Sequence, residues 1–309
     1  MNRREFTFLA AGAALETGWG WSRPLRTAPS KADFTLRIAP ASVELAPGKT
    51  IRTAAYNGTL PGPVLRMKEG KRISVDLFND TNVPELVHWR GQNVTAEADG
   101  AEEEGSPFVP PHGHLCVSLT RGPAGTCCYH THAMAMDDLT KGAYSGQFGF
   151  LRVEPKSHPG SYDQEVFLAG RHGDPFPLHQ GAPQKRLDRG LQARHTPDRA
   201  LGFGDPIRVF GDPIRVKEGQ RVLLRIVNAN ATRQLNLVLP GHKFEVIALD
   251  GNPVPKSVPV ELLTVTVAER VDAIVEMNQP GVWVLGSVRD GVLLYCTAIC
   301  SRTWITAPS

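Results

Sequence analysis

The sequence PVLRMKEGKRISVDLFN at residues 63–79 returns as PIRVKEGQRVLLRIVN at residues 213–228. Aligning Lys68 with Lys217 gives an offset of 149 residues (217 − 68), and the match continues to the final asparagine of each copy. Each copy contains an alternating apolar strand, a Glu-Gly turn and a second alternating strand. Solenoid repeats have much shorter periods, so this repeat indicates a duplicated domain. It predicts two related β-sandwiches in one chain.

The composition favours an all-β fold. The 309 residues include 30 Gly and 25 Pro, which separate short runs rich in Val, Ile and Leu. We expect two Greek-key β-sandwich domains, at residues 33–158 and 159–290. Residues 291–309 are expected to form a divergent C-terminal tail.

A second, shorter repeat lies inside the predicted second domain. The residues Gly-Asp-Pro-Ile-Arg-Val occur at 204–209 and again at 211–216. The copies are offset by an odd number of residues, and a strand that absorbed one of them would exchange its two faces. We therefore expect one copy to loop out.

The overall charge is close to balance. Lys and Arg total 34 against 31 Asp and Glu, for a formal net charge of +3. A balance this close gives no reason to expect a nucleic acid or a membrane surface as partner.

The first residues have the pattern of an export signal. Arg3 and Arg4 are followed by Phe6 and by a short apolar run from Thr7 to Leu15, which is too short to span a bilayer as a helix. The paired arginines resemble a twin-arginine signal. Residues 1–32 are thus predicted to be a signal segment, and the protein to be periplasmic or secreted without a membrane span.

Three histidines are candidate metal ligands. Residues i and i+2 of a strand point to the same face, so His130 and His132 would direct both imidazoles into one cavity. His88 lies at the end of a comparable strand earlier in the chain, within Val-His-Trp-Arg-Gly. Imidazole is a ligand for copper and zinc. His88, His130 and His132 are the predicted metal-binding residues.

The sequence resembles a known family, the multicopper oxidases of laccase-like, three-domain type. The motifs that carry the resemblance follow the family order: Tyr56-Asn57-Gly58, Pro61-Gly62-Pro63, His88-Trp89-x-Gly91, Tyr129-His130-x-His132, Gly146-x-Phe148-Gly149-Phe150 and, in the second domain, Leu239-Pro-Gly-His242 through Gly251. The match covers roughly residues 34–290 and looks like the first two cupredoxin domains. It implies copper as the cofactor and an oxidoreductase that acts on phenols or metal ions with dioxygen.

The resemblance also implies roles for the histidines. In this family, four His-x-His pairs hold a trinuclear copper cluster, and a separate blue copper is held by a Cys and two His. Carried over residue by residue, His88 matches a ligand of the type 2 copper. His130 and His132 match ligands of the type 3 coppers.

Arg90 departs from the family pattern, because it stands where the partner histidine of His88 would be. A guanidinium has only donors and stays protonated, so it cannot coordinate a cation. Two unit charges 4 Å apart repel by about 4 kcal/mol at an effective dielectric near 20, and a divalent ion doubles this. Arg90 opposes copper binding unless it turns to solvent or pairs with an acid such as Glu102–Glu104.

The second departure is larger. No histidine follows His242, so the family's third domain with its blue copper site is not present in the sequence. Cys296 and Cys300 have no neighbouring histidines, and the repeat offset maps His88 onto Leu237. We therefore expect a chain that binds at most one or two copper ions and does not complete electron transfer to dioxygen. A second chain supplying the missing ligands would restore a complete site. The alternatives are a non-catalytic copper-binding or scaffold module and an inactive remnant.

The remaining candidates are weaker. His242 follows a Pro-Gly turn, and His112 and His114 lie in a Pro/Gly loop, so none is predicted to bind metal. Met134 and Met136 offer thioethers near His132 but are expected to pack. Residues 96–105, with three consecutive glutamates, are predicted to be a solvated loop.

A nitrite-reductase-like arrangement is excluded by the residues present. It would place a copper-binding Cys beside a His in the first domain, whereas Thr131 stands between the two histidines. Cys127 and Cys128 precede the pair and, being adjacent on a strand, would point to opposite faces.

Overall fold

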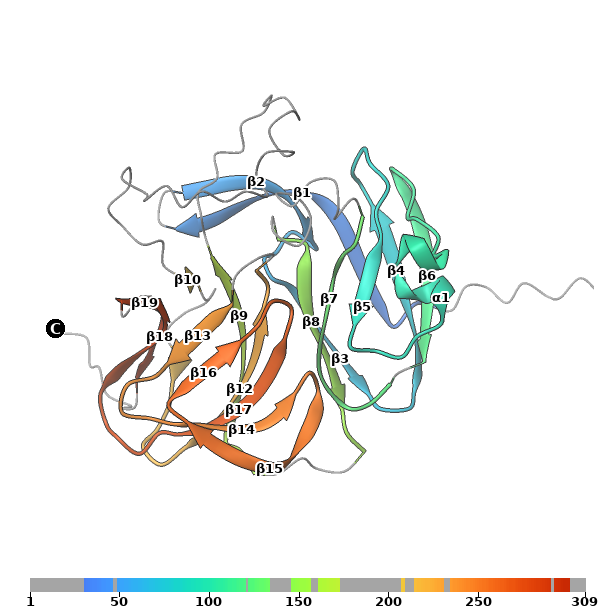
Figure 1. The fold of residues 1–309 in the computed structure, drawn as a ribbon. Helices are drawn as coiled ribbons and strands as arrows, with labels where there is room; N and C mark the ends of the chain where they lie inside the picture. Colours follow the sequence, from blue (N-terminus) through green and yellow to red (C-terminus); the bar gives the residue numbers. More distant parts are fainter. Residues whose placement is uncertain are drawn as a thin grey trace, which may run out of the picture. The chain divides into compact units, whose positions relative to one another are not determined.

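The computed structural model describes residues 31–46, 49–120, 122–133, 146–156, 161–172, 207–208, 214–230, 234–289 and 292–300. Within them, almost every element is a β-strand (Figure 1). The prediction of an all-β chain is confirmed. Most of the predicted signal segment lies outside these residues, as do the two methionines 134 and 136. None of the helices among the described residues is long and apolar enough to cross a membrane.

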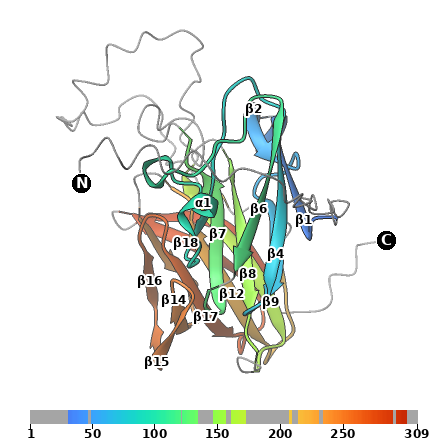
Figure 2. The ribbon, with the colours of Figure 1, turned by 90° about the vertical axis from the view of Figure 1, so that its right-hand side faces the viewer.

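The first sandwich encloses its core between two four-stranded sheets, ordered β2-β1-β4-β6 and β3-β8-β7-β5. β4 and β6 lie side by side in both ribbon views (Figures 1 and 2). The strands are β1 (Phe34–Ala46), β2 (Lys49–Tyr56), β3 (Gly62–Lys68), β4 (Arg72–Asn79), β5 (Val87–Arg90), β6 (Gly113–Thr120), β7 (Gly125–Thr131) and β8 (Phe148–Glu154).

The second sandwich repeats this plan with sheets ordered β10-β9-β12-β17-β14-β15 and β11-β19-β18-β13-β16. Its strands are β9 (Gln164–His172), β10 (Ile207–Arg208), β11 (Ile214–Arg215), β12 (Arg221–Asn228), β13 (Leu235–Val238), β14 (Phe244–Leu249), β15 (Asn252–Val260), β16 (Leu262–Val265), β17 (Arg270–Glu276), β18 (Val282–Arg289) and β19 (Val292–Cys300).

The sequence repeat corresponds to a repeat of strand pairing. β4 is parallel to β1 and antiparallel to β6, just as β12 is parallel to β9 and antiparallel to β17. β3 is parallel to β8, just as β11 is parallel to β19. β19 therefore corresponds to β8 and extends the second sandwich beyond residue 290, into the segment that the sequence suggested was a tail.

The asparagine at the end of each repeat has the same task in both sandwiches. The Asn79 amide donates to the carbonyl of Val109 at 3.1 Å, and its oxygen accepts the backbone N–H of Thr81 at 2.9 Å. The Asn228 amide donates to the carbonyl of Val265 at 2.9 Å, and its oxygen accepts the N–H of Asn230 at 3.0 Å. Both side chains are fully buried. Each asparagine thus satisfies backbone groups where the chain leaves the sheet.

Within the described residues, each copy of the tandem six-residue repeat contributes to a strand, whereas one copy was expected to loop out. β10 in the first copy pairs with β9, and β11 in the second copy pairs with β19. These partners belong to different sheets of the second sandwich. The expectation was wrong because it assumed that one strand had to absorb both copies.

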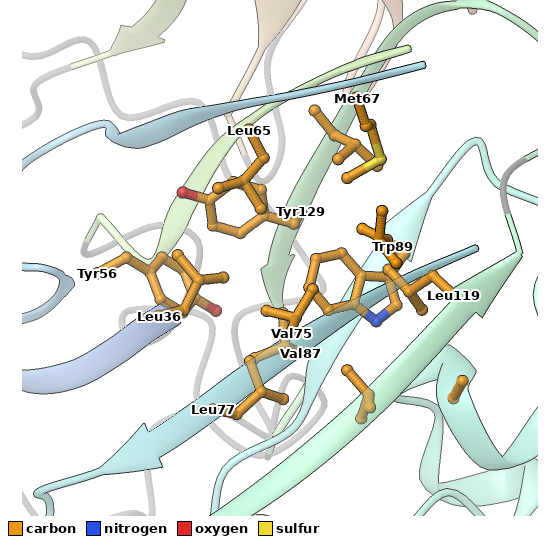
Figure 3. Close-up of a cluster of buried hydrophobic side chains, with 14 of the residues drawn as sticks. Leu36, Tyr56, Leu65, Met67, Val75, Leu77, Val87, Trp89, Leu119 and Tyr129 are labelled. Atoms are coloured by element: carbon orange, nitrogen blue, oxygen red, sulfur yellow. The ribbon is translucent and has the colours of Figure 1, made fainter. Parts of the chain in front are cut away.

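The core of the first sandwich is built around aromatic residues of β5 and β7 (Figure 3). Trp89 and Tyr129 are fully buried, with ring centroids 6.1 Å apart, and Tyr56 contacts Tyr129 edge to face at 5.1 Å. The Tyr129 hydroxyl donates to the carbonyl of Pro63 at 2.7 Å. Alternation then requires the neighbours of Trp89 and Tyr129 to point to the opposite face of the sheet.

That opposite face packs against the second sandwich. Near one end the contact is apolar, formed by a cluster of buried residues from both sandwiches: Leu60, Cys128, Phe148, Phe150, Ala169 and Val227. Cys127 belongs to the core of the first sandwich instead. The prediction that the adjacent cysteines face opposite sides is confirmed.

Beside the apolar cluster lies a buried ionic network. Arg225 of β12 is 2% exposed and Asp272 of β17 is 5% exposed, and they form an ion pair at 2.5 Å. The Thr126 hydroxyl of β7 donates to Asp272 at 2.6 Å and accepts from Arg225 at 3.0 Å. Glu165 of β9 pairs with Arg225 and, at 3.6 Å, with Arg152 of β8. The two sandwiches are therefore joined by charges that are largely buried from water.

The carboxylates respond oppositely to this environment. Burial raises the pKa of Asp272, although Arg225 and Thr126 oppose the rise. Burial also acts to raise the pKa of Glu165, but hydrogen bonds from Arg225 and Arg66 outweigh it and lower that pKa. Glu165 is held as an anion mainly by its two arginine partners.

We predict that Asp272→Asn destabilises the protein by about 3 kcal/mol, because it removes one partner of a buried ion pair and leaves Arg225 with less compensation. Urea unfolding followed by circular dichroism measures the change. Asp80→Asn is the control, since it breaks an exposed pair with Arg37 and is expected to cost less than about 1 kcal/mol. Equal effects of the two substitutions would contradict the prediction.

Candidate metal centre

The pairing of β5 with β7 brings the predicted histidines together. The strands are antiparallel and place His88 directly opposite His130. Val87 and Trp89 enter the core, so His88 and Arg90 point to the other face. His132 follows the last residue of β7, and its backbone N–H donates to the carbonyl of Leu86 at 3.1 Å.

The three imidazoles form a cluster. Ring centroids are 5.3 Å apart for His88 and His130, 5.2 Å for His88 and His132, and 5.9 Å for His130 and His132. The sequence prediction that these side chains lie together therefore agrees with the geometry.

Two of the rings are oriented by backbone carbonyls. His88 Nδ1 lies 3.0 Å from the carbonyl oxygen of Asp99, and His130 Nδ1 lies 2.9 Å from that of Thr131. A carbonyl oxygen can only accept, so each Nδ1 carries the hydrogen and each neutral ring keeps its lone pair on Nε2. This arrangement is typical of histidines that bind a metal through the other nitrogen.

Burial keeps these imidazoles neutral. It lowers the pKa of His130 to about 4, against the raising effect of the Thr131 carbonyl and with smaller lowering contributions from His88, His132 and Arg90. It also lowers the pKa of His88, against the raising effect of Asp99. A neutral ring is the form that coordinates a metal.

A short helical loop supports His88. α1 (Ala96–Asp99) leads into a 3-10 turn (Glu102–Glu104). The Ser106 hydroxyl accepts the N–H groups of Gly100 and Ala101 at 2.9 and 3.1 Å. Gly100 has φ +73°, and a Cβ there would lie 2.0 Å from the carbonyl oxygen of Val87. The close approach places the Asp99 carbonyl against His88. The segment predicted to be a solvated loop is thus a support for His88, although its three glutamates are exposed.

A buried acid supports the other histidine pair. Glu85, 4% exposed, accepts a hydrogen bond from the Thr131 hydroxyl at 2.8 Å and one from the Gln147 amide at 3.0 Å. The Thr131 hydroxyl also accepts the N–H of Ala133 at 3.3 Å. These bonds fix the chain on both sides of His132. Sequence reasoning missed Glu85 and Asp99, because a single acid carries no spacing signal.

Arg90 lies on the same face as His88, as the sequence predicted. It is half-buried, and its Nε is buried without a hydrogen-bond partner. Among the described residues Arg90 forms no ion pair, so the expected alternative of pairing with Glu102–Glu104 is not observed. Its charge contributes to the lowered pKa of both His88 and His130.

The donor set fits copper in kind but not in number. Neutral imidazoles with oriented Nδ1 atoms suit copper. Within the described part of the chain, however, no three His, Cys, Asp or Glu side chains are arranged to hold one ion. The three rings gather without converging on a single point. The three imidazoles would therefore coordinate different metal ions, or coordinate ions that are also bound by ligands outside this cluster.

The other candidate residues lie apart from this cluster. His242 packs edge to face on Trp283 at 5.0 Å, and its Nδ1 lies 3.2 Å from the carbonyl oxygen of Pro240. His112 and His114 contact Asn82 and Asp76 respectively. In the second sandwich, Leu237 of β13 faces Ser287 of β18, where the first sandwich has His88 facing His130. Those equivalent positions hold no metal ligand.

Two family models, both described as multicopper oxidase, match residues 37–158 and residues 179–291. The chain belongs to the multicopper oxidase family. Its two cupredoxin domains confirm the fold and the family that the sequence motifs suggested.

Relatives of this multicopper oxidase chain are distant. It is 27% identical over 291 residues to multicopper oxidase MmcO of Mycobacterium tuberculosis, covering 86% of this chain and 56% of that protein. It is 26% identical to multicopper oxidase mco of Staphylococcus aureus, covering 80% and 53%. The chain spans about half the length of the curated relatives it matches. The solved blue copper oxidase from Nitrosomonas europaea has the same fold, with a TM-score of 0.69, 23% identity and coverage of 87% of this chain and 85% of that one.

We predict that the metal-free protein loses stability as the pH falls from 6.5 toward 4. Unfolded His130 takes up a proton near its ordinary pKa of 6.5, whereas the folded side chain does so near 4. The contribution of this pKa difference to the free energy of unfolding is fully present above pH 6.5 and is lost as the pH falls toward 4. His130→Gln should flatten the dependence, measured by urea unfolding across the window. The exposed His112 gives the control His112→Gln, and the same slope in both variants would contradict the assignment.

Proposed function

We propose that this chain binds copper through His88, His130 and His132 as a partial multicopper site. The observation that carries the proposal is the cluster of three imidazoles, two of which, His88 and His130, are oriented through Nδ1 by carbonyl oxygens. When bound, copper would supply the one-electron chemistry by which this family reduces dioxygen. The residues of this chain hold and orient the imidazoles, and Glu85 and Asp99 maintain that orientation.

We further propose that the chain on its own does not turn over. A blue copper site needs a thiolate beside imidazoles. Cys128 shares the histidine face of β7, but it packs in the apolar cluster between the sandwiches and lies opposite Arg90 rather than opposite a histidine. Cys127 faces the core of the first sandwich. Complete electron transfer would need ligands from outside the described residues or from a second chain.

A second candidate is a scaffold module that binds no copper. Arg90 favours it, because an unpaired guanidinium shares the face of the imidazoles and opposes a nearby cation. Copper content separates the two candidates, since the copper-binding proposal requires metal in the purified protein after reconstitution.

We predict that Arg90→His raises copper retention without producing oxidase turnover, because it replaces a repelling cation by a fourth imidazole. Copper per chain after reconstitution and oxygen uptake with a phenolic donor are the measurements. Arg72→His, on the exposed side of β4, is the control for a histidine added elsewhere. An intense blue absorption band with turnover in the unaltered protein would contradict the proposal of a partial site.

We also propose that the protein is exported to the periplasm or secreted through its paired arginines. Replacing both by lysine, Arg3→Lys with Arg4→Lys, should retain the protein in the cytoplasm, because the twin-arginine route depends on both guanidinium groups. Immunoblots of cell fractions measure this, with Arg72→Lys as control. Unchanged export of the double variant would contradict the assignment.

A further inference from the structure

Arg90 differs from the other buried arginines of the described residues. Arg152 pairs with Glu165, Arg225 with Asp272 and Arg270 with Asp250, at 3.6, 2.5 and 2.9 Å respectively. These pairs reflect the rule that a charge removed from water needs a counter-charge. Arg90 is half-buried and, unlike these three arginines, has no carboxylate partner among the described residues. Its Nε is shielded from solvent and lacks an acceptor, as do those of Arg152 and Arg270.

The described residues around Arg90 offer little negative charge. The face it shares with His88 and His130 presents imidazoles that burial keeps neutral. The Asp99 carboxylate lies 3.4 Å from Nδ1 of His88, which is the side of the ring away from the metal-binding Nε2. Glu85 is committed to Thr131 and Gln147. Copper held by Nε2 atoms would therefore add two positive charges beside an uncompensated guanidinium.

We propose that copper binding at His88, His130 and His132 depends on a small planar oxyanion held by Arg90. This inference rests on the proposed copper binding. A planar oxyanion such as bicarbonate has two oxygens on one side that match the fork of guanidinium donors, and a third oxygen that is free to approach a metal. Such an anion satisfies the donors of Arg90 and offsets its repulsion of copper at the same time.

The experiment compares copper affinity with and without bicarbonate. The metal-free full chain is titrated with Cu²⁺ against a competing chelator, in a non-coordinating perchlorate buffer freed of carbon dioxide and in the same buffer with bicarbonate added. We expect bicarbonate to tighten copper binding about tenfold or more, the gain typical of hydrogen bonds to a charged group. Copper EPR with ¹³C-labelled bicarbonate should show broadening that the unlabelled anion does not give.

Matched variants assign the effect to one side chain. Arg90→Gln keeps a polar side chain but removes the charge, so its copper affinity should no longer respond to bicarbonate. Arg37→Gln removes an exposed arginine that pairs with Asp80 and should retain the full response. Circular dichroism establishes that each variant is folded.

The possible failures are distinguishable. Equal copper affinity in both buffers would overturn the anion proposal and leave the proposed copper binding intact. A bicarbonate response that survives in Arg90→Gln would also overturn it, since the anion would then be held elsewhere. No copper binding even with bicarbonate would overturn both proposals.

Discussion

The antiparallel pairing of β5 with β7 is the constraint from which most of this structure follows. His88 lies opposite His130, and Trp89 lies opposite Tyr129. Because side chains of a strand alternate, the register that buries the two aromatic rings also places the two imidazoles together on the outer face. A shift by one residue would move the aromatic pair out of the core. The hydrophobic energy of the first sandwich thus holds the histidines in position without a metal.

The same alternation links the histidine cluster to the domain interface. Thr126, Cys128 and His130 share one face of β7. Thr126 joins the buried network with Arg225 and Asp272, and Cys128 joins the apolar cluster between the sandwiches. One face of one strand therefore carries a polar contact, an apolar contact and a candidate ligand in succession. The positions of the second sandwich that correspond to His88 and His130 hold Leu237 and Ser287, which are not metal ligands, but this sandwich buries the strand that bears the histidines.

Much of this arrangement could be predicted from the sequence, because it depends on local patterns. The repeat established two related domains, and the His-x-His spacing placed His130 and His132 on one face. The last strand of the second sandwich could not be predicted this way. β19 matches β8 in pairing but shares none of the motif around Phe148 to Phe150. The two strands thus occupy equivalent positions in their sheets although their residues differ.

The interactions between distant residues were also beyond the reach of sequence patterns. Asp99 orients His88 through a backbone carbonyl, and any residue type supplies one. Glu85 is recognisable as a support only when Thr131 and Gln147 are seen around it. The partners of Arg225 come from strands far apart in the chain, on either side of the domain interface. Spacing rules describe one strand at a time, whereas each of these contacts joins separate segments of the chain.

Charge compensation gives the clearest contrast between the interface and the metal site. At the interface, buried arginines and carboxylates alternate, and each cation has a negative neighbour. At the histidine cluster, Arg90 has no carboxylate partner among the described residues, and burial lowers the pKa of the neighbouring His88 and His130. The interface is electrostatically complete in the chain as it stands. The described part of the cluster is not, because a guanidinium without a counter-charge lies on the same face as two imidazoles whose Nε2 lone pairs could bind a cation. A metal ion bound by the imidazoles together with an anion bound by Arg90 would satisfy both kinds of group, whereas either ion alone would satisfy only one.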